Sequence, residues 1–232
     1  MLFADHHVCQ KRVFFFAQHQ HSEQHSLAGD ASNDTAAENA NEQLHRGSAH
    51  VCPECSRVIA ADAVHPVPSP ILAQPNRHTS ILIKPSKGDF FNRYSAGDDL
   101  HIAVSSDVHG VFSFWTNGIQ SDACSLWRNS VEILTNDDVQ LSAHAWNETL
   151  LELCAREGTR KYAAENYQAD TLNCYDFVLD FVKSTRKMSV AEDPRFADKM
   201  TFVESFVVKR MQSVWNYVRV YRRLMERAAP AV

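Results

Sequence analysis

The chain of 232 residues lacks three features that would assign it quickly to a functional class. Its formal charge of -5 gives no basic excess, which argues against a nucleic-acid footprint along the whole chain. No apolar run approaches bilayer length, and the VFFFA segment at residues 13–17 is too short for a signal-peptide core. Six dispersed cysteines do not form a secreted disulfide framework. We expect an intracellular protein, cytoplasmic or nuclear, with no transmembrane segment and no nucleic-acid partner.

The chain does contain enough apolar residues for a core, and its composition divides it into parts. Hydrophobic residues make up 44% of the chain, which predicts one main domain with an appendage. Residues 18–48 are polar and poor in branched and aromatic side chains, so they predict a disordered insertion within an N-terminal segment, residues 1–60. A proline-rich linker follows at residues 61–77, and the folded domain is expected at residues 78–230.

The pattern of the main domain changes from strands to helices. Four segments read as strands, with alternating or continuous apolar residues: HTSILIKP, DLHIAVSS, GVFSFWT and LWRNSVEIL. Apolar stripes at helical spacing follow, including Phe177, Val178 and Phe181 behind a cap at Asp170 or Thr171. Strands first and helices afterwards predict an α+β fold, an antiparallel sheet with helices packed against it.

Cys174 is expected in the first turn of a helix, where free N–H groups lower a thiol pKa. His101 is the best candidate for a partner, because it occupies the strand face opposite Leu100, Ile102 and Val104. A simpler interpretation is that Cys174 is a small core residue and that His101 satisfies a hydrogen bond or faces solvent. The spacing leaves both interpretations open.

Two segments, DLHIAVSSDVHGVFSF and YQADTLNCYDFVLDF, resemble the circularly permuted papain-like thiol proteins, such as lecithin retinol acyltransferases and PPPDE-type isopeptidases. The resemblance implies a permuted papain-like fold, with His101 as general base and Cys174 as nucleophile. Ser113 falls where the acyltransferases place a second histidine. A serine hydroxyl carries no charge to stabilise an imidazolium, so it is the weaker orienting group.

A longer resemblance covers most of the folded chain. CPEC, HTSILIKPSKGDF, DLHIAVSSDVHGVFSFWTNGI, NCYDFVLDFV and FVESFVVKR together are similar to the makorin opposite-strand protein family. This resemblance implies a fold and a family rather than a reaction. The family pattern also includes an N-terminal cysteine, which maps onto Cys9.

The N-terminal segment carries a possible metal site in VCPECSRVI. Cys52 and Cys55 have the two-residue spacing of a zinc knuckle, which lets both thiolates reach one tetrahedral ion. Two unliganded thiols or a redox pair are the alternatives. We expect a small zinc-ribbon-like segment with structural zinc, whose remaining candidate ligands are Cys9 as the third and His7, His6 or His50 as the fourth.

The last helical region interleaves arginines with aromatic residues. This pattern suits a membrane surface, an acidic partner or nucleic acid, but we favour an ordinary amphipathic helix with its apolar stripe in the core and its arginines in water. The site around Cys174 lacks an acidic residue placed to orient His101. We therefore expect a non-catalytic interaction module that binds a protein partner, and keep a cysteine-dependent hydrolase or acyltransferase using Cys174 and His101 as the alternative.

Overall fold

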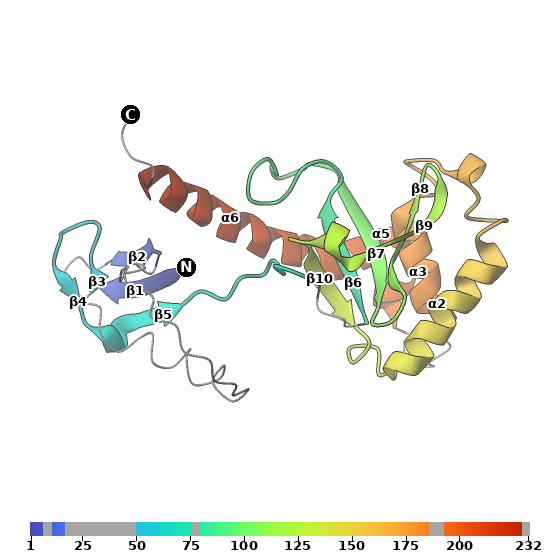
Figure 1. Cartoon of the computed structure of the whole chain (residues 1–232), viewed down its shortest axis with the longest axis horizontal. Coiled ribbons are helices and arrows are strands. Elements are labelled where there is room, and N and C mark those ends of the chain that lie inside the picture. Colours follow the sequence, from blue (N-terminus) through green and yellow to red (C-terminus); the bar gives the residue numbers. More distant parts are fainter. Residues whose placement is uncertain (7–10, 17–49, 76–78, 186–192, 229–232) are drawn as a thin grey trace, which may run out of the picture. The chain divides into compact units, whose positions relative to one another are not determined.

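The structure, a computed structural model, describes residues 1–6, 11–16, 50–75, 79–185 and 193–228. It divides into two compact units, residues 70–222 and residues 1–69 with 223–232. The larger unit is built on a five-stranded sheet in the order β10-β6-β7-β8-β9 (Figure 1), antiparallel throughout. Its strands are β6 (Ser80–Pro85), β7 (Leu100–Ser106), β8 (Gly110–Trp115), β9 (Gly118–Asp122) and β10 (Val131–Thr135).

The central hairpin, β7 and β8, forms where the sequence predicts it. The Ser106 hydroxyl accepts hydrogen bonds from the N–H groups of Val108 and His109, which closes the turn. Gly110 follows with a φ of 91°, and an added Cβ there would lie 2.5 Å from the Asp122 carbonyl oxygen. The turn therefore requires glycine at this position.

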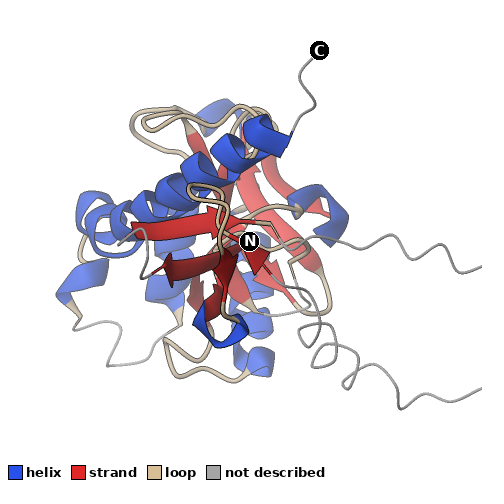
Figure 2. Cartoon of the chain, turned by 90° about the vertical axis from the view of Figure 1, so that its left-hand side faces the viewer, coloured by secondary structure: helices blue, strands red, loops and turns tan. Residues whose placement is uncertain are grey.

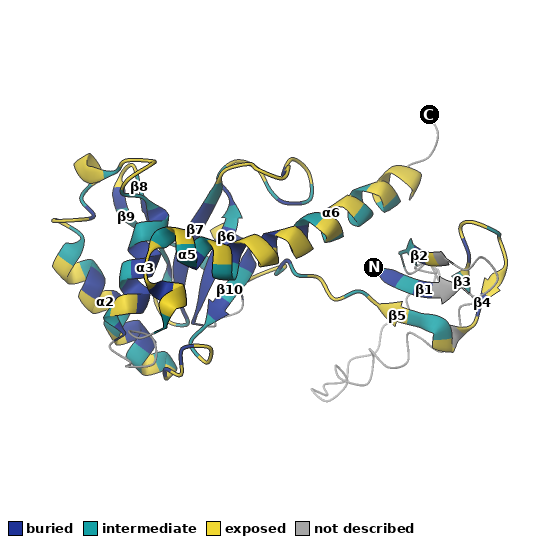
Figure 3. Ribbon diagram, turned by 180° about the vertical axis from the view of Figure 1, so that it is seen from behind, coloured by how far each residue is buried: buried dark blue, intermediate teal, exposed yellow. Residues whose placement is uncertain are grey.

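Strand alternation separates the sheet into two faces. Ile102 and Val104 belong to the main hydrophobic core, together with the apolar residues of the helices. Ala103 belongs to a smaller cluster on the other face, with Leu82, Val111 and Trp127. Because successive side chains of a strand point to opposite faces, His101 shares the face of Ala103. Figure 3 shows that β6 and β7 are buried along most of their length.

Helices cover the face that carries Ile102 and Val104, and Figure 2 distinguishes them from the strands. The helices of this unit begin with α2 (Ala143–Glu157), α3 (Cys174–Ser184) and α5 (Lys199–Phe202); a π-helix, η5 (Val203–Val208), and α6 (Lys209–Ala228) then follow α5 without a break. Short 3-10 helices are η2 (Cys124–Trp127), η3 (Ala164–Asn166) and η4 (Pro194–Phe196). The predicted α+β class with antiparallel strands is confirmed. No described helix has both the length and the apolar character needed to cross a membrane.

The smaller unit is a separate β structure with its own core of Ala4, Val13, Cys52 and Ile59. A three-stranded sheet, in the order β2-β1-β5, accompanies a two-stranded one, β3-β4. Its elements are β1 (Leu2–His6), β2 (Lys11–Phe15), β3 (His50–Val51), β4 (Val58–Ile59), η1 (Ala61–Ala63) and β5 (Val64–Pro66). The stretch predicted as a linker thus contributes η1 and β5, since Val64 and His65 precede the prolines and pair with β1. The predicted insertion at residues 18–48 lies outside the described residues.

Candidate functional site

Cys174 is the first residue of α3, and a capping box fixes this helix start. The N-cap is Asn173, rather than the predicted Asp170 or Thr171, and its Oδ1 accepts a hydrogen bond of 2.9 Å from the Tyr175 N–H. In return the Asn173 N–H donates to Asp176 Oδ2 at 2.8 Å. The free N–H groups of the first turn are therefore largely engaged by the chain itself.

The thiol of Cys174 is buried within the main core, with 3% of the residue exposed. Burial raises its pKa to about 11, although hydrogen bonds from the backbone N–H groups of Ile102, Cys174 and Tyr175 act in the opposite direction. Desolvation thus outweighs the helix end, and the thiol is protonated at neutral pH.

A cavity of about 500 Å³ opens beside this helix start. It is lined by Ser86, Lys87, Asp98, Asp99, Leu100, Trp115, Tyr167, Ala169, Asp170, Asn173, Cys174 and Tyr175. Leu100 is the β7 residue on this wall, in agreement with its place on the helix-covered face. The cavity therefore joins the thiol to carboxylates and aromatic rings, and His101 is not part of its lining.

His101 lies on the other face of the sheet, between two tryptophan rings. The centroids of its ring and of Trp115 are 4.5 Å apart, and those of His101 and Trp127 are 5.6 Å apart. Burial, and to a smaller extent the charge of Lys84, lower the pKa of His101 to about 4, while Asp122 acts in the opposite direction. The imidazole is therefore neutral at pH 7.

The structure does not bring Cys174 and His101 together. The thiol packs on the Ile102 side of the sheet, whereas the imidazole packs on the Trp127 side. Trp115 contacts the His101 ring and also the Tyr167 ring, which lines the cavity with Cys174. Direct proton transfer between a nucleophile and a base requires hydrogen-bond reach, and this arrangement does not provide it.

Ser113, the third predicted site residue, is buried in β8 on the same face as His101. Register pairs it with Gln120 of β9. The buried Nδ1 atom of His101 has no hydrogen-bond partner in the described part of the chain, so the Ser113 hydroxyl does not orient this atom.

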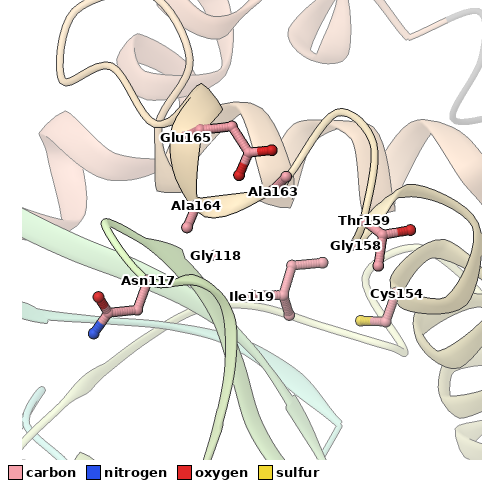
Figure 4. A pocket seen from close by; sticks show the side chains of 9 residues that line it. All are labelled: Asn117, Gly118, Ile119, Cys154, Gly158, Thr159, Ala163, Ala164 and Glu165. Carbon is pink, nitrogen blue, oxygen red and sulfur yellow. The ribbon is translucent and has the colours of Figure 1, made fainter.

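A second cavity, of about 570 Å³, lies between β9 and the segment after α2 (Figure 4). Its lining is mostly small: Asn117, Gly118, Ile119, Cys154, Gly158, Thr159, Ala163, Ala164 and Glu165. Burial raises the pKa of the Cys154 thiol to about 11. With one protonated thiol and one carboxylate, this cavity offers less chemistry than the cavity beside Cys174.

The CPEC segment forms a tight turn between β3 and β4. The Cys52 N–H donates to the Arg57 carbonyl at 2.8 Å, the Ser56 N–H donates to the Cys52 carbonyl at 2.9 Å, and Ser56 has a φ of 58°. His50 packs instead against the Phe15 ring, with 5.2 Å between centroids. Among the described residues no group of three His, Cys, Asp or Glu side chains could hold a metal. Cys9 and His7 lie outside these residues.

Two cations of α6 bind the backbone of the same unit. Arg222 donates to the carbonyls of Phe90, Phe91 and Tyr94, at 3.0, 2.6 and 2.8 Å. Arg210 donates to the Glu132 carbonyl at 3.0 Å. These contacts fit an amphipathic helix packed on its own domain, and they give part of its basic character a structural role.

The fold and the site therefore define an α+β domain with a buried cysteine at a helix start beside an acidic and aromatic cavity. This chain belongs to the family described as DUF4796 C-terminal, which matches residues 65–224. It is 24% identical over 180 residues to the human "MKRN2 opposite strand protein". The aligned region covers 75% of this chain and 78% of that protein. The makorin opposite-strand resemblance is thus supported. No solved structure matches the chain.

The cavity was not predicted from the sequence. Asp98 and Asp99 immediately precede β7, and Trp115 ends β8, so the three residues lie at strand ends. A pair of acids at the entry of a strand is a local signal, but its meeting with Tyr167 and Tyr175 depends on long-range packing.

Proposed function

We propose that this chain is a non-catalytic interaction module that binds a protein partner through a fold related to the permuted papain-like domains. The separation of Cys174 from His101 carries the proposal. A Cys-His pair works when the imidazole takes the thiol proton and the resulting charges stabilise each other. On opposite faces of one sheet, neither group supports the charge of the other.

The electrostatics of the two groups support the same conclusion. An activated thiol has a pKa below the reference of about 8.5, and a useful base titrates near neutral pH. Burial moves the Cys174 pKa to about 11 and the His101 pKa to about 4. Both shifts favour the neutral forms, so we expect no thiolate-imidazolium pair at pH 7.

Thiol alkylation tests this proposal. Labelling of each cysteine is followed by mass spectrometry against pH in the native chain, in His101→Gln and in the control His109→Gln, whose histidine is exposed in the hairpin turn. We expect slow labelling of Cys174 that accelerates on unfolding and is the same in all three folded proteins. Rapid labelling near pH 7 that is lost only in His101→Gln would overturn the proposal.

The alternative is a cysteine-dependent hydrolase or acyltransferase, with Cys174 as nucleophile, His101 as base and Ser113 as orienting group. One observation favours it: the thiol lines a cavity at a helix start, where the backbone N–H groups of Ile102, Cys174 and Tyr175 act to lower its pKa. For His101 to face Cys174, β7 would have to slip by one residue, which exchanges its two faces. Reactive Cys174 in the alkylation experiment is the result expected from this alternative.

We also propose that Cys52 and Cys55 provide two ligands to a structural zinc ion in a zinc-ribbon-like segment. Their turn fits a knuckle, because the two cysteines are separated by two residues and a left-handed residue, Ser56, follows the second of them. Thiolates are also the ligands that zinc prefers in structural sites. The sequence offers Cys9 as the third ligand and His7 as the fourth, with His6 and His50 as rivals for that position.

Metal analysis tests the zinc proposal. The chain purified under reducing conditions should contain about one zinc per chain, as expected for a single closed site. Cys55→Ser should lose the zinc, whereas Cys124→Ser, in η2 of the other unit, should retain it. A native chain that takes up no zinc, even after refolding with the metal, would contradict the proposal.

A further inference from the structure

We infer that the cavity beside the start of α3 binds the cationic side chain of an arginine or lysine in a peptide of the partner protein. This inference rests on the proposed function and names the chemistry of the partner. The residues that line the cavity include three acids, Asp98, Asp99 and Asp170, and one base, Lys87. Three negative charges against one positive charge leave a formal excess of two negative charges.

The carboxylates are available to a ligand. Asp98 uses one oxygen, Oδ2, to accept a hydrogen bond of 2.7 Å from the Ser95 N–H. In the part of the chain that the structure describes, no ion pair engages Asp99 or Asp170; the described pairs use other acids. A guanidinium or ammonium group would therefore form charge-assisted hydrogen bonds without displacing an internal partner.

Aromatic rings supply a second attraction for the same ligand. Trp115, Tyr167 and Tyr175 line the cavity, and the planes of Trp115 and Tyr167 are inclined by 51° with centroids 5.6 Å apart. Burial is the main cause of the raised pKa of both tyrosines, and the negative charge of Asp99 contributes after Cys174 and, for Tyr175, after Tyr94. The carboxylate and the two phenols thus share one space. Rings beside a carboxylate attract organic cations through cation-π contacts.

The helix end at this cavity does not reverse the preference. A free helix N-terminus favours anions, but Asn173 Oδ1 already accepts from the Tyr175 N–H and Asp176 already accepts from the Asn173 N–H. Cys174 adds a buried, protonated thiol to the lining of the cavity. The remaining charge at this end is negative, so the cavity suits a cation.

The size of the cavity suits a side chain. Pockets that hold small ligands have volumes of about 300 to 1,000 Å³, and this one has about 500 Å³. An extended arginine or lysine side chain would place its apolar stem against Leu100 and the rings, and its charge against the carboxylates.

The experiment uses the tryptophan indole signals of the full-length chain in nuclear magnetic resonance. The probe is a five-residue peptide, acetyl-Ala-Ala-Arg-Ala-Ala-amide, and the control replaces arginine with norleucine, which has no charge. We expect a saturable shift of the Trp115 indole at concentrations up to about 100 mM, the weak range expected for one side chain. Trp146, whose indole N–H donates to the Ser105 carbonyl, should not shift.

Variants test the residues. Asp99→Asn should weaken arginine binding about fivefold, the effect of one partly exposed charge pair, and Glu152→Gln on the exposed face of α2 should leave it unchanged. Equal binding of the norleucine peptide, or no saturable shift, would overturn the inference. Tighter binding of free arginine than of the peptide would overturn the assignment to a peptide.

The alkylation experiment keeps this result separate from the proposed function. An inert Cys174 without arginine binding would overturn the cation site alone and leave the interaction module in place. A reactive Cys174 together with arginine binding would overturn the interaction module and retain a cation site beside a nucleophile.

Discussion

The two faces of the five-stranded sheet differ in how they are covered. Helices cover one face, where Ile102, Val104 and Cys174 form part of a large apolar core. The other face is covered by η2 and by the segment around Leu72, and it buries His101 beside Trp127. The thiol and the imidazole thus belong to different cores. Their separation shows that residues which a family motif groups together form one site only when strand alternation places their side chains on the same face of the sheet.

The two faces also differ in the partners of their buried tryptophan side chains. On the helix-covered face, the Trp146 indole N–H donates to the Ser105 carbonyl. On the other face, the Trp127 indole N–H donates to Asp122 at 3.1 Å, and the Lys84 ammonium lies 4.3 Å from the Trp127 ring centroid. On this face a single tryptophan, Trp127, therefore contacts both a cation, Lys84, and an acid, Asp122.

The largest predicted effect tests whether this thin cover is a true core. Trp127→Ala should reduce the free energy of unfolding by about 3 to 5 kcal/mol, because the ring is fully buried. Trp146→Ala, on the helix-covered face, should cost a similar amount. Urea unfolding followed by circular dichroism measures both.

Trp127→Phe is the matched control for this pair. It keeps a ring beside Lys84 and removes the indole N–H, so it should cost less, about 1 to 2 kcal/mol. A cost for Trp127→Ala below that of the phenylalanine variant would show that the second face is not a core.

The second prediction concerns pH. His101 has a folded pKa of about 4 against an ordinary value of 6.5, so the unfolded chain takes up the proton first as the pH falls. The stability contributed by neutral His101 is present above about pH 6.5 and is lost between that pH and about 4, with about 2 kcal/mol lost at pH 5. Urea unfolding at pH 7.5 and pH 5 measures this loss.

Two histidine variants isolate the effect. His101→Gln should lack this component of the pH dependence, and His109→Gln should retain it, because His109 is exposed in the hairpin turn. The same pH dependence in the native chain and in His101→Gln would show that the imidazole is not buried between the tryptophans.

Much of the fold follows from local pattern. The alternation in DLHIAVSS and GVFSFWT predicts the hairpin of β7 and β8, and the stripe of Phe177, Val178 and Phe181 predicts α3. The sequence pattern predicts other elements less clearly. GIQSD forms the edge strand β9 with few apolar residues, and the first two residues of LWRNSVEIL, Leu126 and Trp127, end η2, with Trp127 buried against the sheet.

The side of the sheet on which Cys174 lies could also be predicted in part from the sequence. His101 alternates with Leu100, Ile102 and Val104, and an apolar helix packs on the apolar face of a sheet. That reasoning places Cys174, at the start of the apolar helix α3, on the side away from His101. The cavity was not readable, because the residues from positions 86 to 175 that line it meet only through tertiary packing.

The smallest predicted effect returns to the helix start on the cysteine side. Asn173→Ala removes the side-chain acceptor for the Tyr175 N–H, and it should reduce the free energy of unfolding by about 1 kcal/mol. Asn173→Asp keeps an acceptor there and should change stability by only a few tenths of that amount. Fraying of the first turn should also increase the labelling rate of Cys174 in Asn173→Ala, while Cys154 in α2 keeps its native rate. If the alanine variant changes neither unfolding nor labelling, the cap does not hold Cys174 in the core, and the contrast between the two faces at this residue fails.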